Sequence, residues 1–486
     1  MKQTGILLAI SSLPSPWGIG DLGKAAYEWI DILSEAGVNL WQILPMNPLG
    51  YGNSPYQPYS SFAGDEIYLS LERLQAEGLL EGLPVLSENS AARVDYDGVR
   101  KQKEQWLRKA FAAFVPNKEY KEFCRREWLW PYCAFRAFKH ANGGVCWLEW
   151  PEAHKNWKAG ESYPTPEAEK EANYHAFLQF QFSKQWQEVL DYAHEKGVRI
   201  MGDVPFYVGI DSADVWAEQE AFLLDEKGYP QFVAGVPPDY FSATGQRWGN
   251  PIYNWDYLQK TGFDFWKRRI GYCQRMMDLI RIDHFRAFDT YWKIPASCPT
   301  AIEGAWLEAP GYEVLDTLFR DIPGLELVAE DLGDLRPEVL TLRDHYGLKG
   351  MKVFEFVFDF SGRYARDTGE EKENQILYTG THDNATLKEW YHSLTIAQKR
   401  KLRRWLARKG AANGDVLTRI VHTVLADCAE IVILPLQDVM SLPASARMNT
   451  PGTVGSPNWE WRISDFAAAR AALMALKPEI QKRGRL

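Results

Sequence analysis

The sequence predicts an α/β fold, a (β/α)8 TIM barrel with inserted, largely helical and loop-rich subdomains and no C-terminal β-sandwich. Short apolar runs recur eight times between amphipathic stretches, and three of these runs end near an acid: Asp283, Glu330 and Asp383. The chain has 486 residues, more than the roughly 250 residues of a plain barrel. Hydrophobic residues make up 46% of it, enough for a large core. Acids at the carboxyl ends of barrel strands lie at the mouth, where the active site is built.

The eight apolar runs are the expected strands. Because each buried run alternates with a helical stretch, we expect a parallel sheet with right-handed crossovers, and eight such units close into a barrel. The runs are residues 6–10, 38–44, 198–204, 279–282, 326–329, 351–356, 376–378 and 431–436.

Two stretches interrupt this alternation. Residues 66–172, between the second and third strands, contain apolar residues at helical spacing and predict a helical insertion. Residues 205–260, after the third strand, are rich in proline, glycine and aromatic residues, which indicates a long loop-rich insertion forming an active-site lid. Only about fifty residues follow the last run, too few for a typical domain of roughly 100–150 residues, so residues 1–486 are expected to form one catalytic barrel domain.

Composition indicates a cytoplasmic protein that binds a neutral small molecule. The formal charge of −9 argues against a nucleic-acid surface, and no run approaches the roughly 18–20 apolar residues that cross a bilayer. The six cysteines lack the paired spacing of a zinc site and the density of a disulfide scaffold. We therefore expect reduced thiols and no nucleic-acid or membrane partner; the oligomeric state stays open.

The strand-end acids predict carboxylate chemistry, although such an acid can also cap a helix or pair with a lysine. Asp203 also ends a strand, and we expect it to build the site rather than to transfer a proton. Asp331 points away from Glu330 if the strand alternation holds, so it is expected in a cap or a structural pair.

Aromatic residues make up 14% of the chain, and many fall in the predicted loops, where sugar rings stack on such side chains. Core packing is the alternative for any single ring. The loop aromatics are Tyr51, Tyr56, Tyr59, Tyr207, Trp216, Tyr240, Phe241 and Trp248.

Five segments carry a resemblance to a known family. They are residues 50–59 (GYGNSPYQPY), 235–246 (GVPPDYFSATGQ), 281–286 (RIDHFR), 329–333 (AEDLG) and 379–384 (TGTHDN). In this order they resemble amylomaltase, the 4-alpha-glucanotransferase or disproportionating enzyme family of the alpha-amylase clan. The resemblance extends from residues 13–16 to residues 458–462, essentially the whole chain.

The resemblance implies a retaining transferase that passes an alpha-1,4-glucan segment to the 4-hydroxyl of another glucan or glucose. It makes Asp283 the nucleophile, Glu330 the general acid/base and Asp383 the carboxylate that stabilises the transition state, with no metal and no cofactor. Retaining chemistry needs one ionised and one protonated carboxyl about 5–5.5 Å apart. Arg281 shares a strand face with Asp283 and should favour its ionised form, whereas burial could keep Glu330 protonated.

Other positions are expected to bind substrate. His382 would donate a hydrogen bond to a sugar hydroxyl, and the loop that carries Tyr240 and Phe241 matches the family's lid, which would stack the acceptor sugar and exclude water; an ordinary surface hairpin is the alternative. The expected binding residues are Tyr56, Asp203, Tyr240, Phe241, Trp248, Arg281, His284, His382 and Asn384.

Three other functions compete with the transferase. An alpha-glucan hydrolase on the same barrel would use the same acids with water as acceptor. His284 and His382 beside acids suggest a metal-dependent barrel hydrolase, but the sequence has no His-x-His or His-Glu-x-x-His pairing and only nine histidines. A catalytically silent glucan-binding module would leave the three acids unused.

Three positions depart from the family pattern. Ala287 stands where glycine is usual, Asn53 where aspartate is common, and Glu355 where glutamine is expected. These differences bear on substrate preference and pH optimum more than on the reaction class.

Overall fold

The computed structural model describes residues 2–86, 91–238, 242–369, 371–410 and 414–485. Its centre is a parallel eight-stranded barrel whose strands follow one another in chain order around the ring. A parallel bridge between Val328 and Lys349 joins the two ends of the sheet. The strands are β1 (Gln3–Leu7), β2 (Leu40–Gln42), β3 (Arg199–Val204), β6 (Leu279–Ile282), β9 (Leu327–Ala329), β10 (Gly350–Val353), β13 (Gln375–Tyr378) and β14 (Ile431–Pro435).

Every predicted strand is present, but some boundaries were wrong. Strand β1 ends at Leu7, and the apolar run continues as a buried loop into η1 (Ile10–Ser12). Strand β10 ends at Val353, before η7 (Phe354–Phe356). The apolar runs extend beyond the strands because the segments that leave the barrel are also buried, so burial alone does not mark where strand pairing stops.

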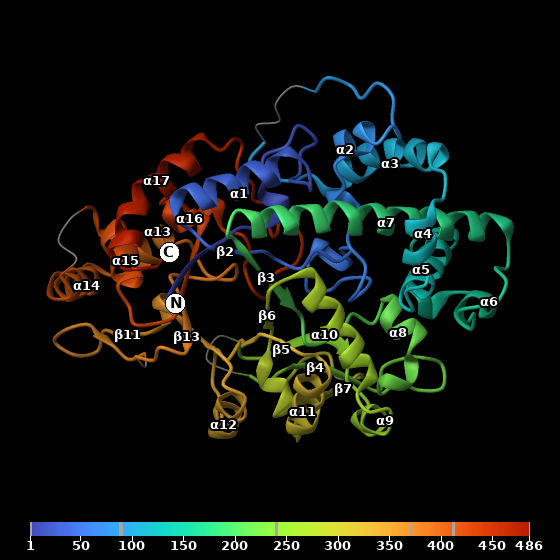
Figure 1. Ribbon diagram of the computed structural model, residues 1–486. Coiled ribbons are helices and arrows are strands. Elements are labelled where there is room, and N and C mark those ends of the chain that lie inside the picture. Colours follow the sequence, from blue (N-terminus) through green and yellow to red (C-terminus); the bar gives the residue numbers. More distant parts are fainter. Residues whose placement is uncertain (1, 87–90, 239–241, 370, 411–413, 486) are drawn as a thin grey trace.

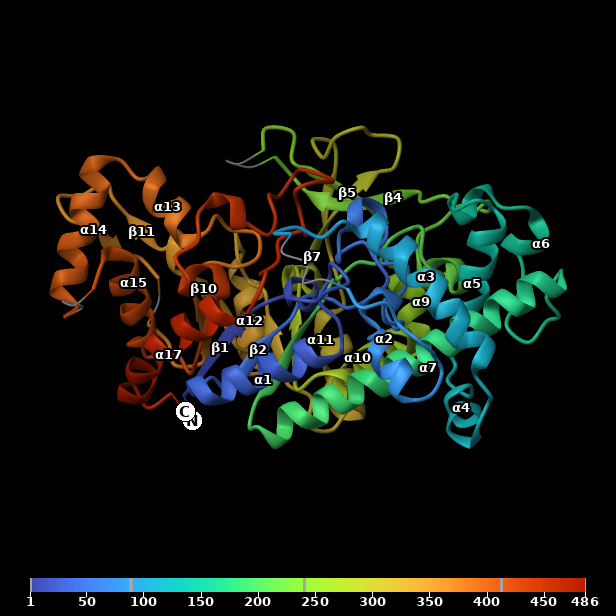
Figure 2. The same ribbon diagram turned by 90° about the horizontal axis from the view of Figure 1, so that it is seen from above.

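Helices surround the barrel in both views (Figures 1 and 2). The thirty-residue helix α7 (Pro166–Glu195) has strong start signals, since the Thr165 hydroxyl accepts from the Ala168 N–H and Pro166 occupies the first turn. The other barrel helices are α1 (Lys24–Ala36), α9 (Trp255–Lys260), α10 (Asp264–Met276), α11 (Gly311–Asp321), α12 (Pro337–His345), α13 (Leu387–Ser393), α14 (Ile396–Arg408), α15 (Val416–Leu425), α16 (Leu436–Val439) and α17 (Ala467–Lys482).

Between β2 and β3 the chain forms mainly helices, and between β3 and β6 it forms helices and strands. The first segment contains α2 (Leu71–Ala76), α3 (Tyr96–Ala113), α4 (Lys118–Phe123), α5 (Leu129–Ala141), α6 (Glu152–Lys155) and α7. After β3 come α8 (Ala213–Ala217), β4 (Phe232–Val236) and β5 (Gln246–Pro251).

Strands β4 and β5 join an antiparallel sheet in the order β5-β4-β7-β8, with β7 (Thr290–Pro295) and β8 (Ala305–Glu308). The prediction of an irregular loop missed these strands, because their glycines and prolines are typical of turns. A short antiparallel pair, β11 (Phe358–Asp359) and β12 (Arg366–Asp367), lies after β10.

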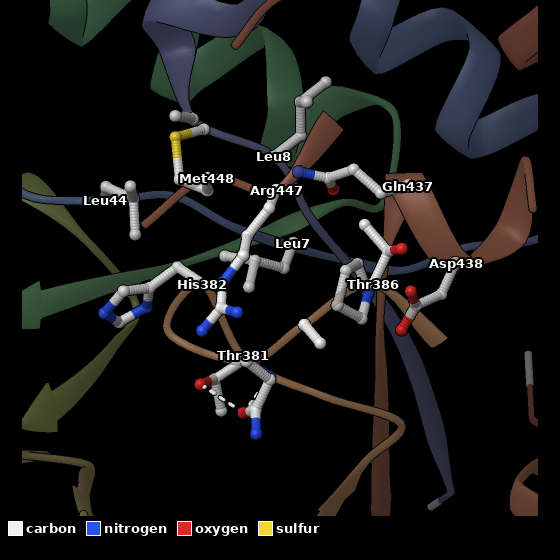
Figure 3. A pocket seen from close by; sticks show the side chains of 14 residues that line it. Leu7, Leu8, Leu44, Thr381, His382, Thr386, Gln437, Asp438, Arg447 and Met448 are labelled. Atoms are coloured by element: carbon white, nitrogen blue, oxygen red, sulfur yellow. Dashed lines mark hydrogen bonds between the residues drawn. The ribbon is translucent and has the colours of Figure 1, made fainter. Parts of the chain in front are cut away.

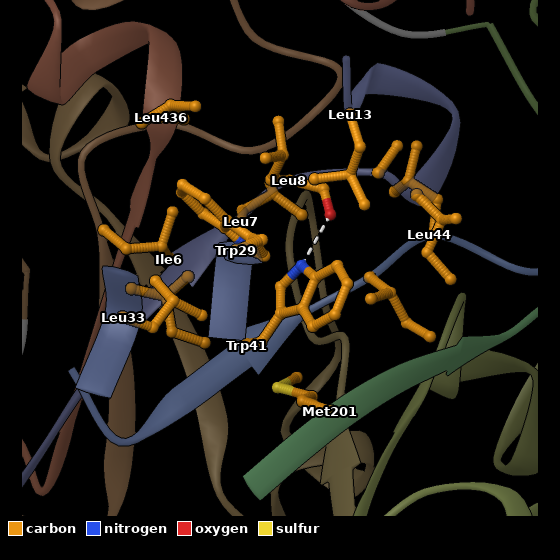
Figure 4. Packing of buried hydrophobic residues seen from close by; sticks show 14 of the residues in the cluster. Ile6, Leu7, Leu8, Leu13, Trp29, Leu33, Trp41, Leu44, Met201 and Leu436 are labelled. Carbon is orange, nitrogen blue, oxygen red and sulfur yellow. Dashed lines mark hydrogen bonds between the residues drawn. The ribbon is translucent and has the colours of Figure 1, made fainter. Parts of the chain in front are cut away.

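The barrel core is packed with aliphatic and indole side chains. The Trp41 indole N–H donates to the Leu8 carbonyl at 2.8 Å, which satisfies a buried polar group between β1 and β2 (Figure 4). Ile6, Trp29 and Leu33 are fully buried beside them. All six cysteines are free thiols. Among the described residues, no helix combines the length and the apolar character required to span a membrane.

Candidate active site

Two of the three acids lie directly beyond barrel strands, and backbone hydrogen bonds tie them together. Asp283 follows β6 and Glu330 follows β9; the Glu330 N–H donates to the Ile282 carbonyl at 3.1 Å. The Glu330 carboxylate accepts the backbone N–H groups of His284 at 2.8 Å and Leu332 at 3.1 Å. Glu330 therefore reaches across to the segment that carries Asp283.

Arg281 is the charged centre of this group and is only 4% exposed. Its Nη1 lies 2.7 Å from both carboxylate oxygens of Asp203, at the end of β3, and 3.0 Å from Oδ1 of Asp283. The Tyr56 hydroxyl donates to Asp203 at 2.7 Å. Asp203 thus holds the guanidinium in place while it accepts the Tyr56 hydroxyl.

The two central acids differ in their pKa. Burial raises the pKa of Glu330 to about 7, with Arg281 opposing the shift and the Asp283 charge adding to it. Burial also raises the pKa of Asp283 to about 6, against the lowering effect of Arg281. The predicted contact with Arg281 is present and lowers the pKa of Asp283 as expected, but burial and the Asp203 and Asp383 charges raise it by more.

The third acid, Asp383, follows β13 by five residues and has a separate set of partners. Burial disfavours its charge, but His382 and the hydrogen bonds from His382 and Asn449 outweigh burial and lower its pKa to about 2. The Asn449 amide donates to Oδ1 at 2.6 Å, and Arg447 donates to the Asp383 carbonyl at 2.9 Å. Sequence reasoning missed both residues, since they lie more than sixty positions from Asp383 in a segment without a recognisable pattern.

Aromatic rings flank the acids. The Tyr56 ring stacks on His382, with centroids 5.1 Å apart and planes at 18°. Trp248, in β5, meets His284 edge to face at 4.8 Å. His284 is half-buried, its Nε2 atom is buried without a hydrogen-bond partner among the described residues, and burial lowers its pKa to about 4.

Hydrogen bonds within residues 381–384 fix the turn that follows β13. Asn384 Oδ1 accepts the backbone N–H and the hydroxyl of Thr381, each at 2.8 Å. Thr381 and Asn384 line a cavity of about 20 Å³. Figure 3 shows Thr381, His382 and Arg447 around this cavity. Asp331 pairs with Arg343 at 2.5 Å, as predicted for a structural acid.

The remaining aromatic residues predicted in the loops do not all lie beside the acids. Tyr240 and Phe241 lie outside the described residues. Trp216 is 2% exposed and packs on Phe135, as does Tyr59, so both rings belong to the core rather than to an exposed binding surface. Among the described residues, no group of three or more His, Cys, Asp or Glu side chains is arranged to hold a metal ion.

The fold and the site define a class of enzyme. A parallel (β/α)8 barrel whose mouth carries two acids with raised pKa values, one of them beside a guanidinium, and a third carboxylate has the groups that glycosidic-bond chemistry requires.

Comparisons with known proteins narrow the class to a family. A family model described as 4-alpha-glucanotransferase matches residues 8–468. The 4-alpha-glucanotransferase of Thermus thermophilus is 42% identical over 95% of both chains, and that of Synechocystis is 43% identical over 95% of this chain and 94% of the relative. The amylomaltase of Streptococcus agalactiae, solved in complex with acarbose, superposes with a TM-score of 0.92 at 35% identity and full coverage of both chains. The chain belongs to the 4-alpha-glucanotransferase family and is a 4-alpha-glucanotransferase, which confirms the transferase prediction over the hydrolase alternative.

Proposed function

We propose that Asp283 is the nucleophile, Glu330 the general acid/base and Asp383 the carboxylate that stabilises the transition state in a double displacement on alpha-1,4-glucans. The observation that carries the proposal is the unequal environment of the first two acids. Arg281 contacts Asp283 at 3.0 Å, whereas burial raises the pKa of Glu330 to about 7. Near neutral pH this favours an ionised Asp283 beside a protonated Glu330.

The reaction then runs in two balanced steps. Glu330 gives its proton to the glycosidic oxygen while Asp283 attacks the anomeric carbon, so the C–O bond to the leaving glucan breaks and a covalent glucosyl-enzyme forms. In the second step Glu330 removes the proton from the acceptor 4-hydroxyl, whose oxygen displaces Asp283 with retention. The enzyme returns to its starting protonation state and no cofactor is consumed.

The neighbouring residues would hold the donor sugar. Asp383 and His382 would hydrogen-bond its hydroxyls, in contacts that strengthen as the ring flattens toward the oxocarbenium ion. Trp248 would supply a stacking surface. The further binding positions proposed are Tyr56, Asp203, Arg281, His284 and Asn384.

The loop after β3 is proposed as a lid whose Tyr240 and Phe241 stack the acceptor and exclude water. We further propose one catalytic barrel domain over residues 1–486 with a helical insertion at 66–172 and the lid insertion at 205–260. A cytoplasmic location and the absence of nucleic-acid or membrane partners are proposed from composition alone.

Maltotriose disproportionation tests the proposal. Chelator-treated protein should convert maltotriose into glucose and a ladder of longer maltooligosaccharides, and Asp283→Asn should form none. Shortening of the substrate without longer products would contradict the acceptor role of the lid. An active Asp283→Asn variant would contradict the assignment of the nucleophile.

A further inference from the structure

A cavity of about 270 Å³ lies away from the acids, where the inserted helices meet α8 and α10. This volume is close to the lower end of small-molecule sites, about 300 Å³. Figures 1 and 2 both place α5 on the side of the barrel opposite α14. None of the lining residues belongs to the proposed catalytic or substrate-binding set. They are Ser60, Phe62, Glu127, Trp128, Pro131, Tyr132, Trp157, Lys158, Ala159, Ala213, Asp214, Trp216, Ala217, Glu218 and Arg268.

The aromatic part of the lining is held rigidly. Trp157 and Trp216 stack with planes 6° apart, and both are at least 94% buried. Their indole N–H groups donate to the carbonyls of Ser162 at 3.3 Å and Lys155 at 3.1 Å. Trp128 is only partly buried and lies nearly parallel to Phe62, at 11°. Trp128 also contacts Phe123, Tyr132 and Tyr272, so that part of its side chain, and not a whole ring face, stays exposed at the cavity.

The polar part of the lining is built from paired groups. Asp214 is 5% exposed, and its Oδ2 accepts the Ser61 N–H at 2.8 Å. Burial raises its pKa to about 6. Arg268 lies between Glu218 at 2.6 Å and Asp264 at 2.7 Å, which orders the Glu218 carboxylate at the cavity. The cavity thus offers ordered carboxylate acceptors beside the partly exposed Trp128 side chain.

The charged residues that line the cavity favour a neutral ligand over an anionic one. Three lining residues are acidic, namely Glu127, Asp214 and Glu218, and two are basic, Lys158 and Arg268. A phosphorylated or carboxylated ligand would meet a net negative wall, whereas a neutral sugar would place its apolar ring face on the indole and its hydroxyls on the carboxylates. Because the proposed substrate is a polymer, a second site on the same chain would raise the local concentration of glucan.

We propose that this cavity is a second alpha-glucan-binding site, in which a glucose unit packs on Trp128 and donates hydroxyl hydrogen bonds to Asp214 and Glu218. The site is linked to the barrel through residues 59–62, because the Ala213 N–H donates to the Tyr59 carbonyl at 2.8 Å. The choice of ligand rests on the function proposed above.

Two variants of the full chain test the site. Trp128→Ala removes the partly exposed ring, and Ala159→Trp, at an exposed lining position, obstructs the cavity without removing any contact. Tyr312→Ala, on the exposed face of α11, is the matched aromatic control. Binding to amylopectin is measured by retardation in native gels, and transfer by glucose release from maltotriose.

Both cavity variants should bind amylopectin about three- to tenfold more weakly, the range for the loss of one ring-stacking contact, while the control is unchanged. Maltotriose transfer should stay within about twofold, since a trisaccharide in the mouth does not reach the second site. Wild-type retardation in both variants overturns the proposal. Failure of the wild-type protein to extend maltotriose contradicts the proposed function instead, and the gel assay still reports on the cavity.

Discussion

Replacing Glu355 by glutamine should stabilise the protein, and the gain should grow with pH. Glu355 lies in η7, and its Oε1 is buried with no hydrogen-bond partner among the described residues. Burial, followed by the charge of Asp438, raises its pKa to about 9, whereas Arg447 and a hydrogen bond with Asn384 act in the opposite direction. Glutamine keeps the shape and the contact with Asn384 but cannot ionise.

The magnitude follows from proton linkage. In the unfolded chain the carboxyl titrates near its ordinary pKa of 4.5, while in the folded protein it stays protonated up to about 9. Below pH 4.5 both states hold the proton and the acid costs nothing. Between pH 4.5 and 9 only the unfolded state releases it, so the free energy of unfolding falls by at most about 1.4 kcal/mol per pH unit. At pH 7 the upper limit is about 3 kcal/mol, and partial exposure of the side chain reduces the expected gain to about 1–3 kcal/mol.

Urea unfolding at pH 5, 7 and 8.5 measures this difference. Glu355→Gln should unfold near the wild-type midpoint at pH 5 and at progressively higher urea than wild type at pH 7 and 8.5. Glu226→Gln, at an exposed turn, provides the matched control for removing one negative charge. A gain that is equal at all three pH values would refute the reasoning, because a packing or surface-charge effect has no such dependence.

Three further outcomes are expected. The rate of maltotriose transfer should follow a narrow bell, rising as Asp283 loses its proton near pH 6 and falling as Glu330 loses its own near pH 7; a plateau to pH 9 would contradict the roles. Asn449→Ala should lower kcat/KM about 10- to 100-fold, because a hydrogen bond to a charged group is worth about 1.5–3 kcal/mol; an unchanged value would mean that Asp383 needs no such support. Tyr56→Phe should lower kcat/KM about tenfold through the lost bond to Asp203, with steady-state kinetics and a thermal melt to separate this effect from unfolding.

The barrel was predictable because its signal is local and repeated. Each strand is a short apolar run between helical stretches. Asp283 and Glu330 follow the ends of two such runs, which predicts that both lie at the carboxyl-terminal mouth of the barrel. Strand ends were less predictable where burial continues beyond pairing, as at Ile10. The antiparallel sheet was missed because Gly235 and its neighbours read as a turn although their backbone pairs across strands.

The support of the site could not be predicted from local patterns. Asn449 reaches Asp383 across 66 positions, and Tyr56 reaches Asp203 across 147. Neither contact follows from periodicity, since each depends on how two loops leave the barrel. The pKa of Asp283 follows the same rule: the lowering effect of Arg281 could be predicted from the sequence, but the opposing burial and the Asp203 charge arise only in the folded chain.

Arg281 contacts both Asp203 and Asp283, and this sharing bears on the different protonation of Asp283 and Glu330, which lie together at the barrel mouth. If Arg281 paired with Asp283 alone, it would hold that carboxylate ionised and leave a strong ion pair for the sugar to displace. Asp203 instead takes both short contacts at 2.7 Å, and Asp283 keeps one at 3.0 Å with a side chain 32% exposed. Asp283, the proposed nucleophile, is thus oriented by Arg281 without sharing in the shortest ion-pair contacts. The hydrogen-bond donors to the Glu330 carboxylate among the described residues are backbone N–H groups, and its pKa lies above that of Asp283, so a shared proton favours Glu330, the proposed general acid.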